Sequence, residues 1–296
     1  VVITQPDLLQ ITHFDTLTYI GGYNVSCNGS LDGEFTINAI GGIRSYTYWI
    51  QTVSTINPSS IDSVFTGLGA TYYEAFVIDQ NGCLDSSDIY LTQPNELLID
   101  SIILSTNVGG WNVSCLGGDN GHATAYVSGG NLGYAYTWSN GDNTNIAETL
   151  SASTYSVVVA DTNGCVVSDS RTLTEPPTAL VINSIACNNC PLVCKGLDNG
   201  TATVSVSGST PGYTYLWDNA NSTIGTYLNP SDTVPSLNDI TPTADTLRAG
   251  VYNVGVWDAN GCYVTGNVTI TEPSISITID SIAVDSMDCY NFNNAS

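Results

Sequence analysis

The sequence predicts an all-β protein built from tandem sandwich repeats, and three observations support this fold class. Heptapeptides of nearly the same sequence (VIDQNGC, VADTNGC and VWDANGC) recur at residues 77–83, 159–165 and 256–262. Between them, apolar and polar residues alternate over short runs that are separated by Gly, Asn and Asp. No stretch of useful length has the 3.6-residue period of an amphipathic helix. Short alternating strands with turn residues between them are typical of a β-sandwich.

Each repeat starts after a strand that ends in proline, and its elements then follow in a fixed order. A first strand precedes a cysteine, and a turn containing glycine leads into an alternating strand. An aromatic strand comes next, and a variable stretch connects it to the heptapeptide and the last strand. The predicted domains are the end of a preceding repeat (1–6), three repeats (7–94, 95–176 and 177–273, the last with an insertion at about 218–248) and the start of a fourth repeat (274–296).

The heptapeptide is predicted to form a β-hairpin. Its Asn-Gly pair joins two apolar strands in every copy, and these two residues tolerate the positive φ that a tight hairpin requires. The pairs are Asn81-Gly82, Asn163-Gly164 and Asn260-Gly261.

The nine cysteines follow the repeat, with one early in each copy and one at the hairpin. We expect them to pair within each copy, where each bridge closes a loop worth about 4 kcal/mol in the chain-entropy model. Such cysteine usage indicates an oxidising, extracellular setting. The predicted bridges are Cys27–Cys83, Cys115–Cys165 and Cys194–Cys262, with a local bridge Cys187–Cys190, while Cys289 is expected to bond to a cysteine of the fourth repeat beyond residue 296.

The combined motifs resemble the SprB repeat of Bacteroidetes surface proteins. They are the TQP junction, CNGSLDG, the YTYW strand and the VxDxNGC…LTxP segment, and the resemblance covers essentially the whole chain. It implies an immunoglobulin-like extracellular module, export by the type IX secretion route and a role in adhesins or surface filaments. The first repeat departs from the pattern because it lacks the residue between its second Tyr and Trp49, and the third departs through its insertion.

Charge excludes two classes of partner. The chain has 27 acidic residues against four Lys and Arg, a formal net charge of −23. Such a surface repels phosphate backbones and anionic membranes, so we expect no nucleic-acid binding. No apolar run approaches the roughly 18 residues of a membrane span, so we expect no membrane insertion. Because the chain opens without Met and ends within a repeat, we expect a longer, processed polypeptide.

The aromatic strands admit two interpretations. Tyr134, Tyr136 and Trp138 fall on one face at a period of two, as do their counterparts in the third repeat. If exposed, this row would stack on sugar rings; if buried, it would fill the sandwich, with Trp against the disulfide. Recurrence in every copy favours the core. In the first repeat Trp49 falls on the opposite face from the two tyrosines unless a bulge intervenes.

Metal sites and catalysis have little support. The heptapeptide aspartates could bind calcium, although an Asx-type hydrogen bond that shapes the hairpin is the simpler interpretation. Three nearby cysteines in the third repeat could suggest zinc, but no fourth ligand is evident. The two histidines do not recur and no nucleophile has a base at a recognisable spacing, so we predict no enzyme activity and no cofactor. The residues concerned are Asp79, Asp161 and Asp258 for calcium, Cys187, Cys190 and Cys194 for zinc, and His13 and His122.

Seven tripeptides of the form Asp-(Ser/Thr)-aliphatic or Met resemble the O-glycosylation motif of Bacteroidetes secreted proteins. Part of this recurrence reflects the IDSI consensus of the first strand, which does not account for the sites in loops. We expect several of these hydroxyl groups to carry glycans. The candidates are Thr16, Ser63, Ser101, Thr233, Thr246, Ser281 and Ser286.

The junctions between repeats suggest a mechanical role. Each last strand passes through a proline into the next first strand without a Gly/Ser linker, and proline fixes φ. We therefore expect an extended rod that serves as a stalk or filament segment of a bacterial surface adhesin, with self-association into a filament or array. The alternatives are an adhesin module that binds surface polysaccharides through its variable loops, or a spacer for an enzyme elsewhere. The junction prolines are Pro6, Pro94, Pro176 and Pro273.

Overall fold

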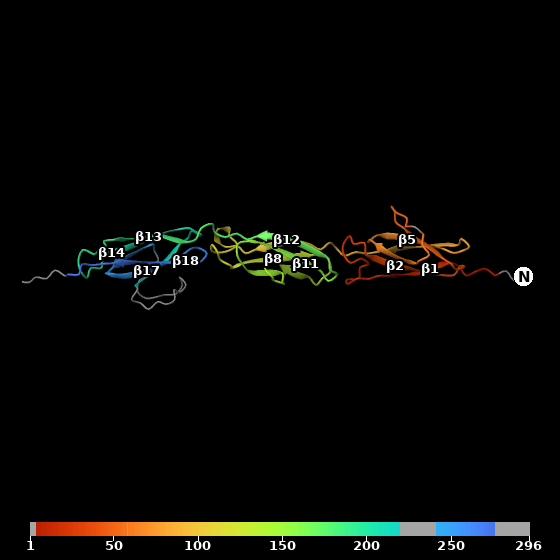
Figure 1. The fold of residues 1–296 in the computed structure, drawn as a ribbon, viewed down its shortest axis with the longest axis horizontal. Coiled ribbons are helices and arrows are strands. Elements are labelled where there is room, and N and C mark those ends of the chain that lie inside the picture. The colour runs from red at the N-terminus through yellow and green to blue at the C-terminus, as the bar shows by residue number, and fades with distance from the viewer. Residues whose placement is uncertain (1–3, 58, 220–240, 276–296) are drawn as a thin grey trace, which may run out of the picture. The chain divides into compact units, whose positions relative to one another are not determined.

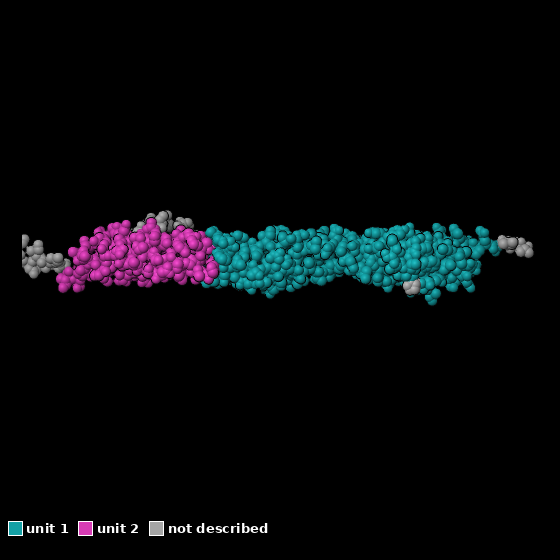
Figure 2. Space-filling model, turned by 90° about the horizontal axis from the view of Figure 1, so that it is seen from above, with its two compact units in different colours: residues 1–175 teal, residues 176–296 magenta. Residues whose placement is uncertain are grey.

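The computed structural model describes residues 4–57, 59–219 and 241–275. The chain divides into two compact units, Val1–Glu175 and Pro176–Ser296, which Figure 2 distinguishes by colour. The first unit contains repeats 1 and 2, and the second contains repeat 3. The described residues are almost entirely strands and turns, with one short 3₁₀ helix, η1 (Val108–Gly110).

Every repeat consists of two antiparallel sheets of three strands (Figure 1). In repeat 1 the strand orders are β1-β2-β4 and β3-β5-β6, and the other two repeats reproduce both orders with their own strands. This arrangement confirms the predicted all-β, immunoglobulin-like sandwich. The strands of repeat 1 are β1 (Gln10–Thr16), β2 (Gly33–Ile40), β3 (Thr47–Gln51), β4 (Val64–Leu68), β5 (Tyr72–Ile78) and β6 (Leu84–Tyr90).

Repeats 2 and 3 use the same plan with small changes of length. Repeat 2 forms the sheets β10-β8-β7 and β12-β11-β9, and repeat 3 forms β13-β14-β16 and β15-β17-β18. The strands are β7 (Leu98–Leu104), β8 (Gly121–Ser128), β9 (Ala135–Trp138), β10 (Ile146–Leu150), β11 (Thr154–Ala160), β12 (Val166–Thr172), β13 (Val181–Asn188), β14 (Gly200–Ser207), β15 (Thr214–Asn219), β16 (Thr243–Leu247), β17 (Gly250–Trp257) and β18 (Tyr263–Ile270).

Alternation of side chains places one face of each sheet in a shared core. In β2, Phe35 and Ile37 are buried while the residues between them are half-buried. They pack with Ile50 of β3 and Val77 of β5, which belong to the other sheet. Since successive side chains of a strand point to opposite faces, a period of two in the sequence is sufficient to build this core.

The aromatic strand lies in the core of repeats 2 and 3, as its recurrence predicts. Trp138 and Trp217 are 2% and 1% exposed, which excludes these tryptophans as an exposed sugar platform. Each indole nitrogen donates to a backbone carbonyl, that of Thr144 at 3.0 Å and that of Thr241 at 3.2 Å. A buried indole therefore keeps its polar group satisfied.

Repeat 1 lacks one residue of the aromatic strand, and a different residue occupies the core position. The strand contains no bulge. Ile50 is fully buried at the position that tryptophan occupies in the other repeats. Trp49 points to the opposite face, as the alternation predicts, where its ring stacks on Phe76 with centroids 4.9 Å apart. Those two residues are direct partners across β3 and β5. The core of repeat 1 thus contains an aliphatic side chain where the core of repeat 2 contains an indole.

Truncation of the core tryptophan should destabilise repeat 2 strongly. We expect Trp138→Ala to lower the free energy of unfolding by about 3–5 kcal/mol, because it removes a buried aromatic side chain and leaves a cavity. The matched control is Thr137→Ala, since Thr137 is the exposed neighbour on the same strand and its truncation should change stability by less than about 0.5 kcal/mol. Urea unfolding followed by circular dichroism measures both. Equal effects would contradict the assignment of Trp138 to the core.

Candidate functional site: the joint between successive repeats

The heptapeptide forms a hairpin in all three repeats, and its turn is longer than the Asn-Gly pair alone. In repeat 1 the Asp79 N–H donates to the carbonyl of Cys83 at 3.0 Å, which encloses a loop of three residues. Gly82 has a φ of 86°, and the corresponding glycines have 85° and 84°. Asn81 does not have a positive φ. Gly82 alone adopts the left-handed conformation in this loop, which is the conformation that a three-residue hairpin loop requires at its last position.

The heptapeptide aspartate organises this turn through its carboxylate. In repeat 1 one oxygen of Asp79 accepts the N–H groups of Asn81 at 2.9 Å and Cys83 at 2.8 Å. The other oxygen accepts the N–H of Ile43, which follows β2, at 2.8 Å. The carboxylate therefore both closes the hairpin and ties it to the opposite sheet. Asp161 and Asp258 repeat this pattern, with Asn131 and Thr210 as the donors from the opposite sheet.

These hydrogen bonds favour the charged form of Asp79 and Asp258. The N–H of Ile43 is the largest influence on Asp79, and with those of Cys83 and Asn81 it lowers the pKa of this carboxyl from 3.8 against the opposing effect of burial. Burial also opposes ionisation of Asp258, but donors from Ser209, Thr210 and the hairpin still lower its pKa. The aspartates thus perform the hairpin-shaping role that the sequence predicts.

Neither metal interpretation gains support from the geometry. The heptapeptide carboxylates point at N–H donors, and the part of the chain that the structure describes contains no group of three His, Cys, Asp or Glu side chains that could hold a metal. Cys187 and Cys190 are bonded to each other, as predicted, so neither sulfur is available as a thiolate ligand for zinc.

The loop that carries the early cysteine is held by the junction that leads to the next repeat. In repeat 1 the N–H groups of Asn24 and Val25 donate to the carbonyl of Thr92, and the side chain of Asn24 accepts the N–H of Thr92 in return. Gln93 accepts the N–H of Gly29 at 2.9 Å. The residue before the junction proline therefore holds the loop through a hydrogen bond to the second residue after the early cysteine.

The same hydrogen bond between the junction and the loop is present in the other repeats, although it was not predicted from the sequence. Glu175 accepts the N–H of Gly117 at 2.5 Å, and Glu272 accepts that of Gly196 at 2.6 Å. The signal was present as a Gln or Glu before every junction proline and a Gly two residues after the early cysteine of each of the three full repeats. It could not be interpreted without knowing that the end of the last strand lies beside this loop.

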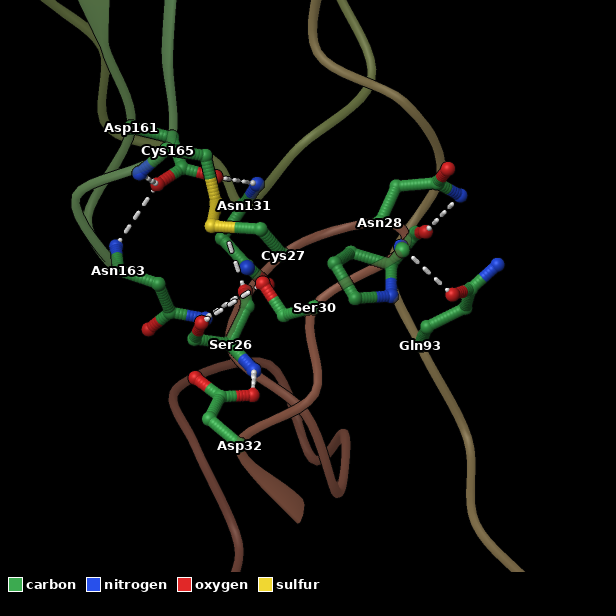
Figure 3. Close-up of a disulfide and its surroundings, with 12 residues drawn as sticks. Ser26, Cys27, Asn28, Ser30, Asp32, Gln93, Asn131, Asp161, Asn163 and Cys165 are labelled. Atoms are coloured by element: carbon green, nitrogen blue, oxygen red, sulfur yellow. Dashed lines mark hydrogen bonds between the residues drawn. A yellow bond between two sulfur atoms is a disulfide. The ribbon is translucent and has the colours of Figure 1, made fainter. Parts of the chain in front are cut away.

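Cys27 does not bond to Cys83 but to Cys165, the hairpin cysteine of the following repeat (Figure 3). The two Cα atoms are 5.7 Å apart and 138 residues separate them in the chain. This finding overturns the predicted pairs Cys27–Cys83 and Cys115–Cys165. The covalent bond lies between two repeats, so it does not link the two sheets of one sandwich.

The reason lies in the length of one strand. Cys83 immediately precedes β6, whereas the Cys27 loop is hydrogen-bonded to Thr92, which follows the far end of β6. A strand of seven residues spans about 23 Å, and a disulfide requires Cα atoms within about 7 Å. The early and hairpin cysteines of one repeat are therefore at opposite ends of it. The occurrence of one early and one hairpin cysteine in every repeat concealed this separation.

A second contact supports the disulfide at this joint. The side-chain amide of Asn163, from the Asn-Gly pair of repeat 2, donates to the carbonyl of Ile20 in repeat 1 at 3.1 Å. It also donates to the carbonyl of Ser26 at 3.2 Å (Figure 3). The hairpin of repeat 2 is thus hydrogen-bonded to two backbone carbonyls of repeat 1. We call the hairpin 161–165 the plug and the loop 20–30 the socket.

The remaining cysteines divide into bonded and free groups. Cys115 and Cys262 are disulfide-bonded. Among the cysteines that the structure describes, Cys83 and Cys194 are free and exposed, so the predicted pair Cys194–Cys262 is wrong as well. Cys289 lies outside the described residues.

The candidate glycosylation sites are dispersed over the repeats. Thr16 and Thr246 are exposed, whereas Ser63 and Ser101 are half-buried. Thr246 has a φ of 58° in the short β16 region and donates to the adjacent Asp245 at 2.9 Å. Thr233, Ser281 and Ser286 lie outside the described residues, as does most of the insertion at 218–248.

Repeat 1 also carries an open groove of about 660 Å³ between the ends of β2 and β3. The guanidinium of Arg44 lies 5.9 Å from the centre of the Tyr46 ring, at a distance typical of a cation–π contact. The Tyr46 hydroxyl donates to the Gly41 carbonyl, as the corresponding tyrosines of the other repeats do to Gly129 and Gly208. The groove is thus lined by an aromatic ring and one of the few cations of this acidic chain.

Comparison with known proteins identifies the repeat. A family model described as the SprB repeat matches residues 23–55, 112–143 and 190–222, one segment in each predicted repeat. The matched segments include the socket loops and the aromatic strands. None of the curated proteins matches the chain. In the described part of the chain, no helix has the length and apolar character needed to cross a membrane.

Solved structures show only distant likeness. A 1.5-MDa bacterial ice-binding adhesin is 13% identical over 91% of this chain and 99% of that one, with a TM-score of 0.45. Tandem repeats from the extending region of a large adhesion protein are 13% identical over 89% and 74%, with a TM-score of 0.28. The chain spans 45% of the eight N-terminal Ig domains of the Down syndrome cell adhesion molecule, at 10% identity and a TM-score of 0.31. Likeness at this level says nothing about function.

The role of the heptapeptide aspartate can be tested through pH. Because the folded pKa of Asp79 lies below its ordinary value, the stability that this carboxylate contributes is present above pH 3.8 and is lost as pH falls through the folded pKa. Asp79→Asn puts an amide donor against the N–H of Ile43, so the variant should unfold at lower urea concentration at pH 7. The gap to the unsubstituted chain should narrow as the pH falls below 3.8 and through the folded pKa of Asp79.

Asp7→Asn is the matched control, because Asp7 is an exposed aspartate of the same repeat. It should leave the urea midpoint unchanged across the same pH range. A gap between Asp79→Asn and the original chain that stays constant down to pH 2 would show that ionisation of Asp79 does not stabilise the hairpin.

Proposed function

We propose that this chain, which is a tandem array of SprB repeats, is a structural segment of a cell-surface adhesin whose role is to transmit force along a stalk or filament. The single observation that carries this proposal is the Cys27–Cys165 bridge, which joins two successive repeats covalently. Repeats that are linked in this way bear tension through a disulfide as well as through the backbone. The role is structural rather than enzymatic, and export by type IX secretion belongs to the same proposal.

Two features support a tensile role. Cys27 and Cys165 are 138 residues apart in the sequence, and the bridge joins them directly. While the bridge is intact, unfolding of either sandwich therefore cannot increase the distance between these two cysteines. The junction adds a non-covalent grip, because the side chain of Gln93, immediately before Pro94, accepts a hydrogen bond from the socket loop. Of these two features, the bridge is the one that joins two repeats.

The acidic surface suits an exposed location. Formal net charge of −23 with few lysines and arginines keeps a large polar surface soluble, and disulfides persist in oxidising, extracellular settings. Within this proposal the exposed Thr16 and Thr246 are the described sites best placed to carry O-glycans. The partners are further copies of the array and surface polysaccharides.

Stretching single molecules tests the tensile role. When the chain is pulled from both ends, the fully unfolded length in reducing buffer should exceed that in oxidising buffer by at least about 450 Å, the span of 138 extended residues. Cys27→Ser together with Cys165→Ser should shrink this difference. Equal unfolded lengths in the two buffers would contradict a covalent path across the joint.

A second candidate function, carbohydrate binding, is favoured by the groove beside Arg44. A tyrosine ring and a guanidinium together suit a sugar that carries a carboxylate or sulfate, since the ring contacts the apolar face and the cation pairs with the acid. Glycan-array binding by the chain, lost at least tenfold in Arg44→Ala and retained in the control Arg171→Ala, would support this function. Absence of binding to acidic glycans would remove it.

A further inference from the structure

The joint in the first unit defines a rule for pairing: the early cysteine of one repeat bonds to the hairpin cysteine of the repeat that follows it. Cys27 and Cys165 obey this rule. Cys83 is the hairpin cysteine of repeat 1, and Cys194 is the early cysteine of repeat 3. Both are free and exposed among the described cysteines. Each is therefore one half of a joint whose other half is a complementary repeat.

Cys83 is held as the bonded Cys165 is held. Asp79 accepts the N–H groups of Asn81 at 2.9 Å and Cys83 at 2.8 Å. Around Asp161 both corresponding distances are 2.9 Å. Because the backbone of the two hairpins is fixed by the same bonds, the sulfur of Cys83 is presented in the same way as a sulfur that forms an inter-repeat bridge. The hairpin 79–83 is a plug without a socket.

Cys194 lies in a loop that is held by two of the hydrogen bonds that hold the occupied socket, although Pro191 stands in place of Asn24. The N–H of Gly196 donates to Glu272 at 2.6 Å, and the N–H of Leu192 donates to the carbonyl of Thr271 at 2.8 Å. The corresponding two bonds hold the socket loop of repeat 1. A thiol that is fixed on a preformed loop differs from an exposed cysteine on an unstructured surface. The loop that carries Cys194 is a socket without a plug.

We propose that Cys83 and Cys194 are two half-sites that link this array covalently to further SprB repeats. Cys194 takes the hairpin cysteine of one such repeat, and Cys83 takes the early cysteine of another. This inference rests on the pairing at the joint and is independent of the proposed surface role. A second copy of this chain is a suitable probe, because it presents both complementary cysteines.

The bond forms by exchange with a low-molecular-weight disulfide such as oxidised glutathione. One cysteine thiolate attacks the glutathione disulfide, which yields a mixed disulfide and releases one glutathione thiolate. The second cysteine thiolate then attacks the protein sulfur of the mixed disulfide and releases the other glutathione thiolate. The two protons lost by the cysteines are taken up by the two glutathione thiolates, so two protein thiols are oxidised and one glutathione disulfide is reduced.

A bond between Cys194 of one copy and Cys83 of the next is heterologous, since the two cysteines belong to different repeats. Heterologous contacts propagate from copy to copy, whereas a bond between identical residues stops at a dimer. Oligomer size therefore distinguishes this pairing from random oxidation of exposed thiols.

The test incubates the full chain with oxidised and reduced glutathione and separates the products on a non-reducing gel. We expect a ladder of covalent oligomers, and mass spectrometry of the digested products should find a peptide that joins Cys194 to Cys83. In a Cys289→Ser background, Cys83→Ser and Cys194→Ser should each stay monomeric, because each variant then retains only one kind of half-site. An equal mixture of the two variants should form dimers and nothing larger.

Recognition beyond thiol chemistry is tested by Asn81→Ala. The corresponding Asn163 donates to two socket carbonyls at the occupied joint, so loss of the Asn81 amide should slow oligomer formation about threefold or more. The neighbouring exposed residue supplies the control, Gln80→Ala, which should leave the rate unchanged. Homodimers of either serine variant, monomers closed by a Cys83–Cys194 bond within one chain, or absence of oligomers from the original chain would each overturn the proposal. Equal unfolded lengths in the stretching experiment would remove the pairing on which this inference rests, whereas a negative glycan-array result would leave it standing.

Discussion

The disulfide between Cys27 and Cys165 is the constraint on which the joint depends. It exists because a seven-residue strand separates the hairpin cysteine of repeat 1 from the socket of the same repeat. A bond within the repeat is geometrically excluded, and the next repeat supplies the partner. The length of one strand therefore leads to a covalent bond between repeats 1 and 2. The energy of this bond acts on the connection between folds, whereas each fold is stabilised by its own buried core.

The heptapeptide of repeat 2 combines the formation of the fold with the formation of the joint. Its aspartate shapes the turn and ties the turn to the opposite sheet, its glycine permits the turn, and its asparagine and cysteine reach repeat 1. In repeat 2 this division of labour is visible as Asp161, Gly164, Asn163 and Cys165. The near identity of the three copies in the sequence thus has two physical causes, one inside the repeat and one at its end. The junction glutamine or glutamate completes the arrangement from the socket side.

Much of the fold could be predicted from the sequence because the signals are local. Alternation along residues 33–40 places Phe35 and Ile37 in the core, and the position of Trp49 on the opposite face follows from the same period. The disulfide partners could not be predicted, since pairing depends on which ends of two sandwiches meet and not on spacing along the chain. The grip of Gln93 on Gly29 also depends on that three-dimensional adjacency. Both cysteines of the joint, Cys27 and Cys165, could be recognised from the sequence as disulfide-forming residues, but each was predicted to bond to the wrong partner.

Peptide mapping under non-reducing conditions tests the central claim most directly. The chain should be digested at acidic residues with free thiols blocked beforehand, and the linked peptides should be identified by mass spectrometry before and after reduction. The joint predicts a peptide that contains Cys27 bonded to one that contains Cys165, together with a blocked thiol at Cys83 in the monomer. A peptide that joins Cys27 to Cys83 would contradict the account, because it would place the bridge inside one repeat and leave the joint without its covalent bond.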